Sequence, residues 1–333
     1  MQNSENSPNQ NGQNSNKKTL FIKDLSAGDS VCTRFLIRQK QTMTNKNGKP
    51  YLALLLSDKT GDLEGRVWEG SEQMALTFSE GDVVTISGRV NLFQNRMQIS
   101  VEHLVPVSQE EIDLKDYLST PSIDIDALYT DLLKTFENLR NPFVKELGLA
   151  LLRDPEIAKR YKICPAAKTI HHAFIGGLLS HSMQLIRLVD SILPLYEDID
   201  RDLMVFGCAF HDFGKIYELH TQGRMGYTDE GRLVGHIAIG ITLIDRKIQS
   251  IPEFPEELEW HIKHLILSHH GHLEYGSPKR PHTIEAELLH LVDHMDSRIN
   301  SIQTFMRNDK VDARWTGYHQ AYDQYYFKPE KYL

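Results

Sequence analysis

The sequence predicts an α+β multidomain protein in which a five-stranded β-barrel is followed by an all-α domain. Its 333 residues correspond to about two domains of about 150 residues each. After a polar start, the first third of the chain contains short runs rich in Val, Ile, Leu and Phe between turn signals, which is typical of strands. From Asp126 onward the apolar residues recur at helical spacing, so the second domain is expected to consist of helices.

Composition excludes several classes of protein. With 40% hydrophobic and 25% charged residues, the chain can bury a core of ordinary size. Its apolar runs are far shorter than the roughly 20 residues that cross a bilayer, and no basic segment followed by an apolar stretch marks a secretory signal. Three cysteines without short spacing exclude a disulfide scaffold and a thiolate zinc site. We therefore expect a cytoplasmic protein that does not bind a membrane.

Charge and histidine are distributed unevenly along the chain. The net charge of −8 argues against a protein held to nucleic acid by bulk electrostatics. The predicted barrel is neutral, whereas residues 108–333 carry 25 basic and 34 acidic side chains. Fifteen of the 16 histidines lie between His171 and His319. An acidic region rich in histidine often holds metal.

Five segments are expected along the chain. Asn, Gln and Ser make up 12 of the first 16 residues, so residues 1–18 are predicted to be a disordered tail. Residues 19–107 form the barrel, and the polar stretch 108–125 is read as a linker. Residues 126–310 form the helical domain, and an aromatic C-terminal tail, 311–333, has no assigned role.

The first domain has the element order of an OB-fold. The runs "VCTRFLIRQKQTM", "YLALLLSD", "LEGRVW", "GDVVTISGRVNLF" and "QNRMQISVEHLVPV" supply five strands, and "SEQMALTF" supplies a short helix. The stretch "LLLSDKTGDLEGRVW" followed by "GDVVTISGRV" resembles OB-fold domains that bind single-stranded nucleic acid or tRNA. That resemblance implies stacking and phosphate-contacting groups among Arg34, Tyr51, Arg66, Trp68, Arg89, Phe93 and Arg96.

Histidine and aspartate recur inside apolar helical runs of the second domain. These runs are "GGLLSHSMQLI", "DLMVFGCAFHDFGKI", "GRLVGHIAIG", "HLILSHHGHLEYGSPKRP" and "EAELLHLVDHMDSR". Burying an ionisable group costs several kcal/mol unless it is paired or binds metal. Imidazole and carboxylate without thiolate suit Mn, Fe, Co or Zn, and the residue types do not choose among them.

The spacing H…HD…H…HH…D resembles the HD-domain superfamily of metal-dependent phosphohydrolases. Together with the predicted OB-fold, the chain resembles the YhaM family of 3′→5′ exoribonucleases. The resemblance implies that one metal is held by His181, His211, Asp212 and Asp293. It implies that Asp212 bridges to a second metal, held also by His236, His269 and His270. Mn²⁺ is the first expectation, with Co²⁺ and Fe²⁺ as alternatives.

The resemblance also implies a reaction. Two metals about 3.5–4 Å apart can hold a hydroxide that attacks a phosphodiester in line. Lys215 could neutralise charge on the phosphate, and His172 could reach the leaving group or a phosphate. Lys279 and Arg280 are candidate nucleic-acid contacts, as is Arg298, which is predicted to lie off the metal face. The expected partner is single-stranded RNA, with single-stranded DNA left open, and a homo-oligomer is expected.

Two other functions compete with this one. A phosphohydrolase acting on free or cyclic nucleotides would use the same metal ligands, with the OB-fold in a regulatory role. The OB-fold argues against it, and the "GYP" signature of cyclic-di-GMP enzymes is absent after His236. A non-enzymatic binding module would need the metal site to be structural, which an intact ligand set disfavours.

Overall fold

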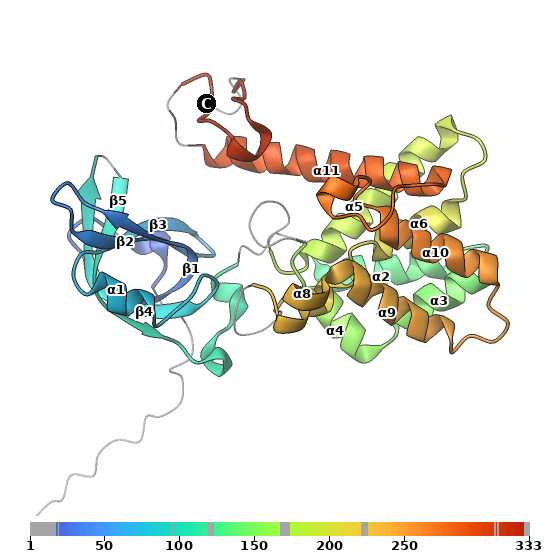
Figure 1. Ribbon diagram of the computed structural model, residues 1–333, viewed down its shortest axis with the longest axis horizontal. Coiled ribbons are helices and arrows are strands. Elements are labelled where there is room, and N and C mark those ends of the chain that lie inside the picture. The colour runs from blue at the N-terminus through green and yellow to red at the C-terminus, as the bar shows by residue number, and fades with distance from the viewer. Residues whose placement is uncertain are drawn as a thin grey trace, which may run out of the picture. The chain divides into compact units, whose positions relative to one another are not determined.

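The computed structural model describes residues 18, 20–94, 96–118, 123–166, 174–220, 226–309, 311 and 313–329. Within this part of the chain two compact units are formed, one ending at residue 118 and the other starting at residue 123 (Figure 1). The predicted tail lies outside the described residues except for Lys18. The Lys18 side chain is buried in the first unit, where its ammonium lies 3.1 Å from Asp58.

The first unit is a closed barrel of five strands, which confirms the predicted fold. The strands are β1 (Ser30–Thr44), β2 (Pro50–Asp58), β3 (Gly61–Val67), β4 (Val83–Phe93) and β5 (Arg96–Pro106), with the short helix α1 (Ser71–Ala75) between β3 and β4. Their order around the barrel is β1-β2-β3-β5-β4, and β1 closes the barrel by pairing with β4. Only the β3–β5 pair is parallel among the strands described.

Alternation along the strands decides which side chains face the barrel core. On β2, Leu52, Leu54 and Leu56 are buried, so Tyr51 lies on the outer face. On β3 the same alternation buries Leu63 and Val67 and leaves Glu64 and Arg66 outside. The outer faces of β2 and β3 therefore present polar and aromatic side chains together.

The predicted linker packs on the barrel over much of its length. Residues 109–111 and 114–116 form short 3₁₀ turns, and Tyr117 and Leu118 are buried. The Asp116 carboxylate lies 3.1 Å from the Lys59 ammonium, and its carbonyl accepts a hydrogen bond from Lys59 N. The polar composition that predicted a linker therefore conceals buried anchors, because Glu111 pairs with Arg34 and Asp116 pairs with Lys59 of the barrel.

The second unit is helical, as predicted, and its helices are capped by residues visible in the sequence. Aspartate, asparagine or threonine accepts a backbone hydrogen bond at the start of six of the described helices. The helices are α2 (Ile125–Glu137), α3 (Pro142–Leu152), α4 (Pro155–Ile163), α5 (Gly177–Ile192), α6 (Arg201–Phe210), α7 (Lys215–Glu218), α8 (Asp229–Val234), α9 (His236–Ile248), α10 (Glu256–Ser268) and α11 (Ile284–Asn308).

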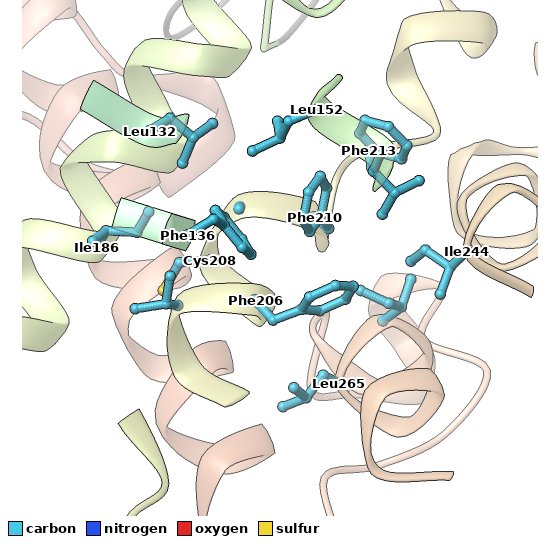
Figure 2. Packing of buried hydrophobic residues seen from close by; sticks show 14 of the residues in the cluster. Leu132, Phe136, Leu152, Ile186, Phe206, Cys208, Phe210, Phe213, Ile244 and Leu265 are labelled. Carbon is cyan, nitrogen blue, oxygen red and sulfur yellow. The ribbon is translucent and has the colours of Figure 1, made fainter. Parts of the chain in front are cut away.

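Helix α6 runs through the core of this unit. All ten of its residues except Arg201 are buried, and Phe206 and Phe210 meet Phe136 at 6.4 and 5.4 Å between ring centroids (Figure 2). A helix that is apolar on every side belongs at the centre of a bundle. Its C-terminal end therefore delivers the next residues, His211 and Asp212, into a buried position. Among the described residues, no helix is both long enough and apolar enough to cross a membrane.

Candidate metal centre and aromatic groove

Five helices of the second unit bring the seven predicted ligands together. One residue comes from the middle of α5, two follow α6, one begins α9, two end α10, and one lies on α11. They are His181, His211, Asp212, His236, His269, His270 and Asp293. Their ligand atoms fall into two groups that could each hold a metal ion: Asp212, His236, His269 and His270, and His181, His211 and Asp293.

Two glycines allow these backbones to approach. A Cβ on Gly214 would lie 1.9 Å from the carbonyl oxygen of His236, so only glycine lets the turn after Asp212 meet the start of α9. Gly271 has a φ of +75° and follows His270 directly. A left-handed residue there ends α10, as glycine commonly does at helix C-termini. The two adjacent histidines then lie where the helix stops.

Each histidine ring is oriented by a hydrogen bond at Nδ1. The acceptors are Asp296 for His181 (2.9 Å), Gly207 O for His211 (3.2 Å), Glu218 for His236 (3.1 Å), Ile266 O for His269 (2.8 Å) and Tyr275 O for His270 (3.0 Å). Histidines that bind metal usually donate their second ring nitrogen in this way, which fixes the tautomer. The arrangement turns Nε2 of each ring away from these acceptors, so that Nε2 is the atom that could bind a metal ion.

The Nε2 atoms converge on two carboxylates. Asp212 Oδ1 lies 3.4 Å from His236 Nε2 and 3.6 Å from His269 Nε2, while Oδ2 lies 3.4 Å from His211 Nε2. Asp293 Oδ1 lies 3.0 Å from His181 Nε2 and 3.7 Å from His211 Nε2. The two oxygens of Asp212 thus face the two groups of ligands, as a bridging carboxylate would.

The donor set fits a divalent metal ion. The Nε2 atoms of His211, His236 and His269 are buried and have no hydrogen-bond partner among the described residues. A buried ring nitrogen without a partner is costly, so its presence in a native fold requires an explanation such as an ion. Imidazole nitrogens with carboxylate oxygens are ligands that Mn, Fe, Co and Zn accept.

Electrostatics favours the ligand forms of most of these groups. Burial acts to raise the pKa of Asp212, yet the Lys215 ammonium and the His211 ring hold it well below its usual range. Burial also opposes ionisation of Asp293, whose pKa is nevertheless lowered by His211 and His181. Burial, reinforced by His269, lowers the pKa of His270 to about 4. The carboxylates are therefore anionic and His270 is neutral at pH 7.

His181 is the exception. Burial acts to lower its pKa, but hydrogen bonds to Asp293 and Asp296 raise the pKa to about 9. Without metal the ring therefore carries a proton between two carboxylates. A metal ion bound at Nε2 would replace that proton.

Sequence reasoning missed Asp296 and Glu218, which orient His181 and His236. Asp296 is 2% exposed and also accepts hydrogen bonds from Gln184 (2.6 Å) and Asn300 (2.9 Å). Glu218 accepts from both the backbone and the ring of His236. The available signal was an acidic residue within an apolar helix, three residues after Asp293 in one case and three after Lys215 in the other.

The other predicted groups of this domain lie in different places. The Lys215 ammonium lies 2.6 Å from Asp212 Oδ2 and donates to Ala166 O at 2.8 Å, so it touches the cluster. His172 lies outside the described residues. Lys279 and Arg280 are exposed in the loop after α10, and they do not line the cavity described next.

A cavity of about 620 Å³ opens beside the cluster. The ligands His269, His270 and Asp293 line it together with His294, Arg298 and Tyr322. Arg298, predicted to lie off the metal face and to contact nucleic acid, lines the same cavity as three of the ligands. Five residues past Asp293, Arg298 points to another side of α11. His294 and Ser297 lie between the two directions and also line the cavity, so one cavity includes both Asp293 and Arg298.

The barrel carries a second cavity, of about 520 Å³, which we call the aromatic groove. Five of the predicted nucleic-acid contacts line it: Tyr51, Arg66, Trp68, Phe93 and Arg96. Tyr51 and Trp68 stack with ring centroids 4.9 Å apart, and the Arg66 guanidinium lies 6.0 Å from the Tyr51 ring centroid. Trp68 is 48% exposed and Phe93 is 59% exposed, so aromatic faces remain available to a ligand.

Two arginines of the barrel do not join this groove. Arg34 donates to the Glu111 carboxylate at 2.6 Å and to its carbonyl at 3.2 Å, so it anchors the segment after β5. Arg89, on β4, does not line the groove. The OB-fold resemblance implied both as candidates, but it does not specify which face of a strand each one occupies.

Comparisons with known proteins agree with this architecture. Residues 178–298 match the model of the HD domain, and residues 36–107 match that of an OB-fold nucleic acid binding domain. The chain is 33% identical to the 3′-5′ exoribonuclease YhaM of Bacillus subtilis over 284 residues, covering 85% of this chain and 90% of that protein. It is 31% identical to the 3′-5′ exoribonuclease YhaM of Listeria innocua over 288 residues, covering 86% and 91%.

Proposed function

The chain belongs to the YhaM family of 3′-5′ exoribonucleases, and we propose that it hydrolyses single-stranded RNA from the 3′ end at a centre of two divalent metal ions. The observation that carries the proposal is the orientation of five histidines. Each is fixed at Nδ1, and the Nε2 atoms of His181, His211, His236 and His269 lie 3.0 to 3.7 Å from Asp212 or Asp293. A structural cluster of histidines would not leave three buried nitrogens without partners.

In this proposal each of the two groups of ligands holds one metal ion. His181, His211 and Asp293 would hold one ion, His236, His269 and His270 the other, and Asp212 would serve both through its two oxygens. When bound, such a pair of ions supplies an activated water at neutral pH and stabilises charge on the phosphate. We propose Mn²⁺ as the first choice among the metals that this donor set accepts, with Co²⁺ and Fe²⁺ next.

Lys215 has a double role in this proposal. Burial acts against its charged form, but Asp212 raises its pKa, so the ammonium persists at the edge of the cluster. Its contact of 2.6 Å keeps the bridging carboxylate anionic. The same ammonium is available to neutralise charge that develops on the phosphate.

The aromatic groove supplies strand binding. Stacking on aromatic side chains accepts every base, which suits an enzyme that degrades RNA without regard to sequence. Arg66 and Arg96 would contact phosphates, and such contacts release counterions, so binding weakens as salt rises. We propose that the enzyme is a cytoplasmic homo-oligomer that acts on single-stranded RNA, with single-stranded DNA as a second candidate substrate.

A gel time course with 5′-labelled single-stranded RNA and Mn²⁺ tests the proposal. We expect a ladder that shortens from the 3′ end, abolished by a chelator and by Asp212→Ala. The matched control is Asp131→Ala, which removes an exposed aspartate from α2 and should leave turnover unchanged. Intact RNA with Mn²⁺, Co²⁺ and Fe²⁺ alike would contradict the proposal. Hydrolysis of cyclic dinucleotides in the same assay would then favour a phosphohydrolase of small nucleotides.

A further inference from the structure

The C-terminal residues 313–329 fold back as a small hairpin, which we call the C-terminal hairpin. Its two sides are joined by backbone hydrogen bonds from Thr316 N to Tyr326 O, His319 N to Gln324 O and Lys328 N to Arg314 O. The segment lies at the C-terminal end of α11 in Figure 1. No role is predicted for this aromatic stretch from its sequence.

A buried ion pair fixes the hairpin to the end of α11. The Lys328 ammonium lies 3.0 Å from the Asp309 carboxylate, and the two side chains are only 4% and 7% exposed. Asp309 also accepts a hydrogen bond from Gly317 N at 3.1 Å. Both ends of the hairpin are therefore attached to the residue that follows α11.

A stack of rings connects the hairpin to the metal end of the helix. Phe305 of α11 contacts His319 with ring centroids 4.4 Å apart. His319 stacks on Tyr322 at 4.6 Å with an angle of 14° between the ring planes. The guanidinium of Arg298 lies over the Tyr322 ring, 4.9 Å from its centroid. Arg298 and Phe305 are seven residues apart on one face of α11, and the hairpin spans the two turns between them.

The end of this stack faces the cavity beside the metal cluster. Arg298 and Tyr322 line that cavity with His294 and the ligands His270 and Asp293. Arg298 is exposed, and no carboxylate of the described residues forms an ion pair with it. Its guanidinium is held in place by an aromatic ring instead of by an acidic partner, so its charge and its plane remain available to a ligand.

We infer that this cavity binds the 3′-terminal nucleotide of the strand, with the base stacked on the Arg298 guanidinium that Tyr322 supports. The inference rests on the proposed function and names the residues that hold its substrate. A volume of about 620 Å³ suits a ligand of nucleotide size. Arginine planes stack on unpaired bases, and the neighbouring metal ligands place the phosphate where hydrolysis would occur. The C-terminal hairpin is then a wall of the active site.

Binding of adenosine 5′-monophosphate to the Mn²⁺-loaded protein, measured by calorimetry beside ribose 5-phosphate, tests the inference. Arg298→Ala should weaken binding of the nucleotide by about 5- to 150-fold, the range that base stacking supplies. Binding of ribose 5-phosphate should change less than about twofold. Arg298→Lys should behave like Arg298→Ala, because lysine keeps the charge but lacks the plane. Tyr322→Ala should shift nucleotide binding in the same direction by a smaller factor.

Tyr325→Ala is the matched control, since Tyr325 is an exposed tyrosine of the same hairpin that does not line the cavity. Its nucleotide affinity should equal that of the unmodified protein. Equal losses for both ligands in Arg298→Ala would show that the guanidinium binds phosphate and would overturn the stacking assignment. Unchanged nucleotide affinity in both Arg298 variants would overturn the inference, even where RNA degradation is intact. Intact RNA with the unmodified protein would instead overturn the proposed function, which calorimetry does not measure.

Discussion

The metal cluster and the aromatic groove both consist of residues that the sequence singled out, but they are built in opposite ways. In the cluster, His211 and His269 are 1% exposed, and each ring is oriented by hydrogen bonding at Nδ1. In the groove, Trp68 and Phe93 are about half exposed and rest on the outside of a strand ladder. One site is specified by burial and the other by exposure.

This difference explains why the metal ligands could be predicted residue by residue, whereas the groove residues were predicted only as a group of candidates. A buried histidine or aspartate must be satisfied, so polar residues within apolar runs have few permitted arrangements. An exposed arginine or aromatic residue has many permitted arrangements, and its residue type does not say which face of a strand it occupies. The cluster gathers all seven expected ligands, whereas Arg34 lies away from the groove and pairs with Glu111.

Gly214→Ala is expected to damage the cluster most. Its Cβ would lie 1.9 Å from His236 O, so the turn carrying Asp212 must move away from α9. We expect a loss of about 2 kcal/mol or more in the free energy of unfolding, as for other overpacked sites, together with weak metal binding. Thermal unfolding and a Mn²⁺ titration measure the two effects. The control Gly317→Ala, with no atom closer than 3.5 Å to the new methyl, should change neither; equal behaviour of the two variants would contradict the prediction.

Asp296→Asn should weaken metal binding by about 10- to 100-fold, the usual effect of removing a partner that orients a ligand. Both carboxylate oxygens of Asp296 accept hydrogen bonds, so an asparagine must turn its NH₂ group toward one of the donors. Glu218→Gln should weaken metal binding by less than tenfold. The single oxygen Oε1 of Glu218 accepts both hydrogen bonds from His236, and a glutamine amide keeps one such oxygen. Calorimetric metal titration compares them, and a larger loss for Glu218→Gln would reverse our assignment.

Trp68→Ala tests the groove alone. We expect RNA affinity to fall about 5- to 10-fold, in the lower part of the range for base stacking because Trp68 is half exposed. Metal affinity and the hydrolysis of a dinucleotide should not change. Fluorescence anisotropy with a labelled oligonucleotide measures binding, with the exposed Trp260 of α10 substituted by alanine as the control. Equal losses for both variants would remove the groove from the binding surface.

The smallest effect is expected for the phosphate contacts. Arg96→Ala should reduce the slope of log affinity against log salt by about 0.7, the value for one contact to a single strand. Arg34→Ala should leave the slope unchanged, since Arg34 is occupied by Glu111. Anisotropy titrations between about 50 and 200 mM salt measure both slopes. A change for Arg34 and none for Arg96 would reverse the faces that we assign.

The two folds and the residue types of the metal centre could be predicted from the amino-acid sequence alone. Alternating apolar residues predicted the barrel strands, and ionisable side chains within apolar helices predicted a cluster, because burial of such groups is tolerated only when they are paired. The doublets His211-Asp212 and His269-His270 were visible as local signals next to glycine.

The side chains that support that centre could be identified only from the folded arrangement of the helices. Asp296 and Glu218 are orienting groups because α5 and α9 present a ring nitrogen to them. The segment after β5 was predicted to be a linker, but Glu111 and Asp116 attach it to the barrel through Arg34 and Lys59. The C-terminal hairpin reaches the metal cavity through contacts between residues that are far apart in the chain or separated by two helical turns. Such contacts depend on how helices pack, and no local pattern of residues encodes that.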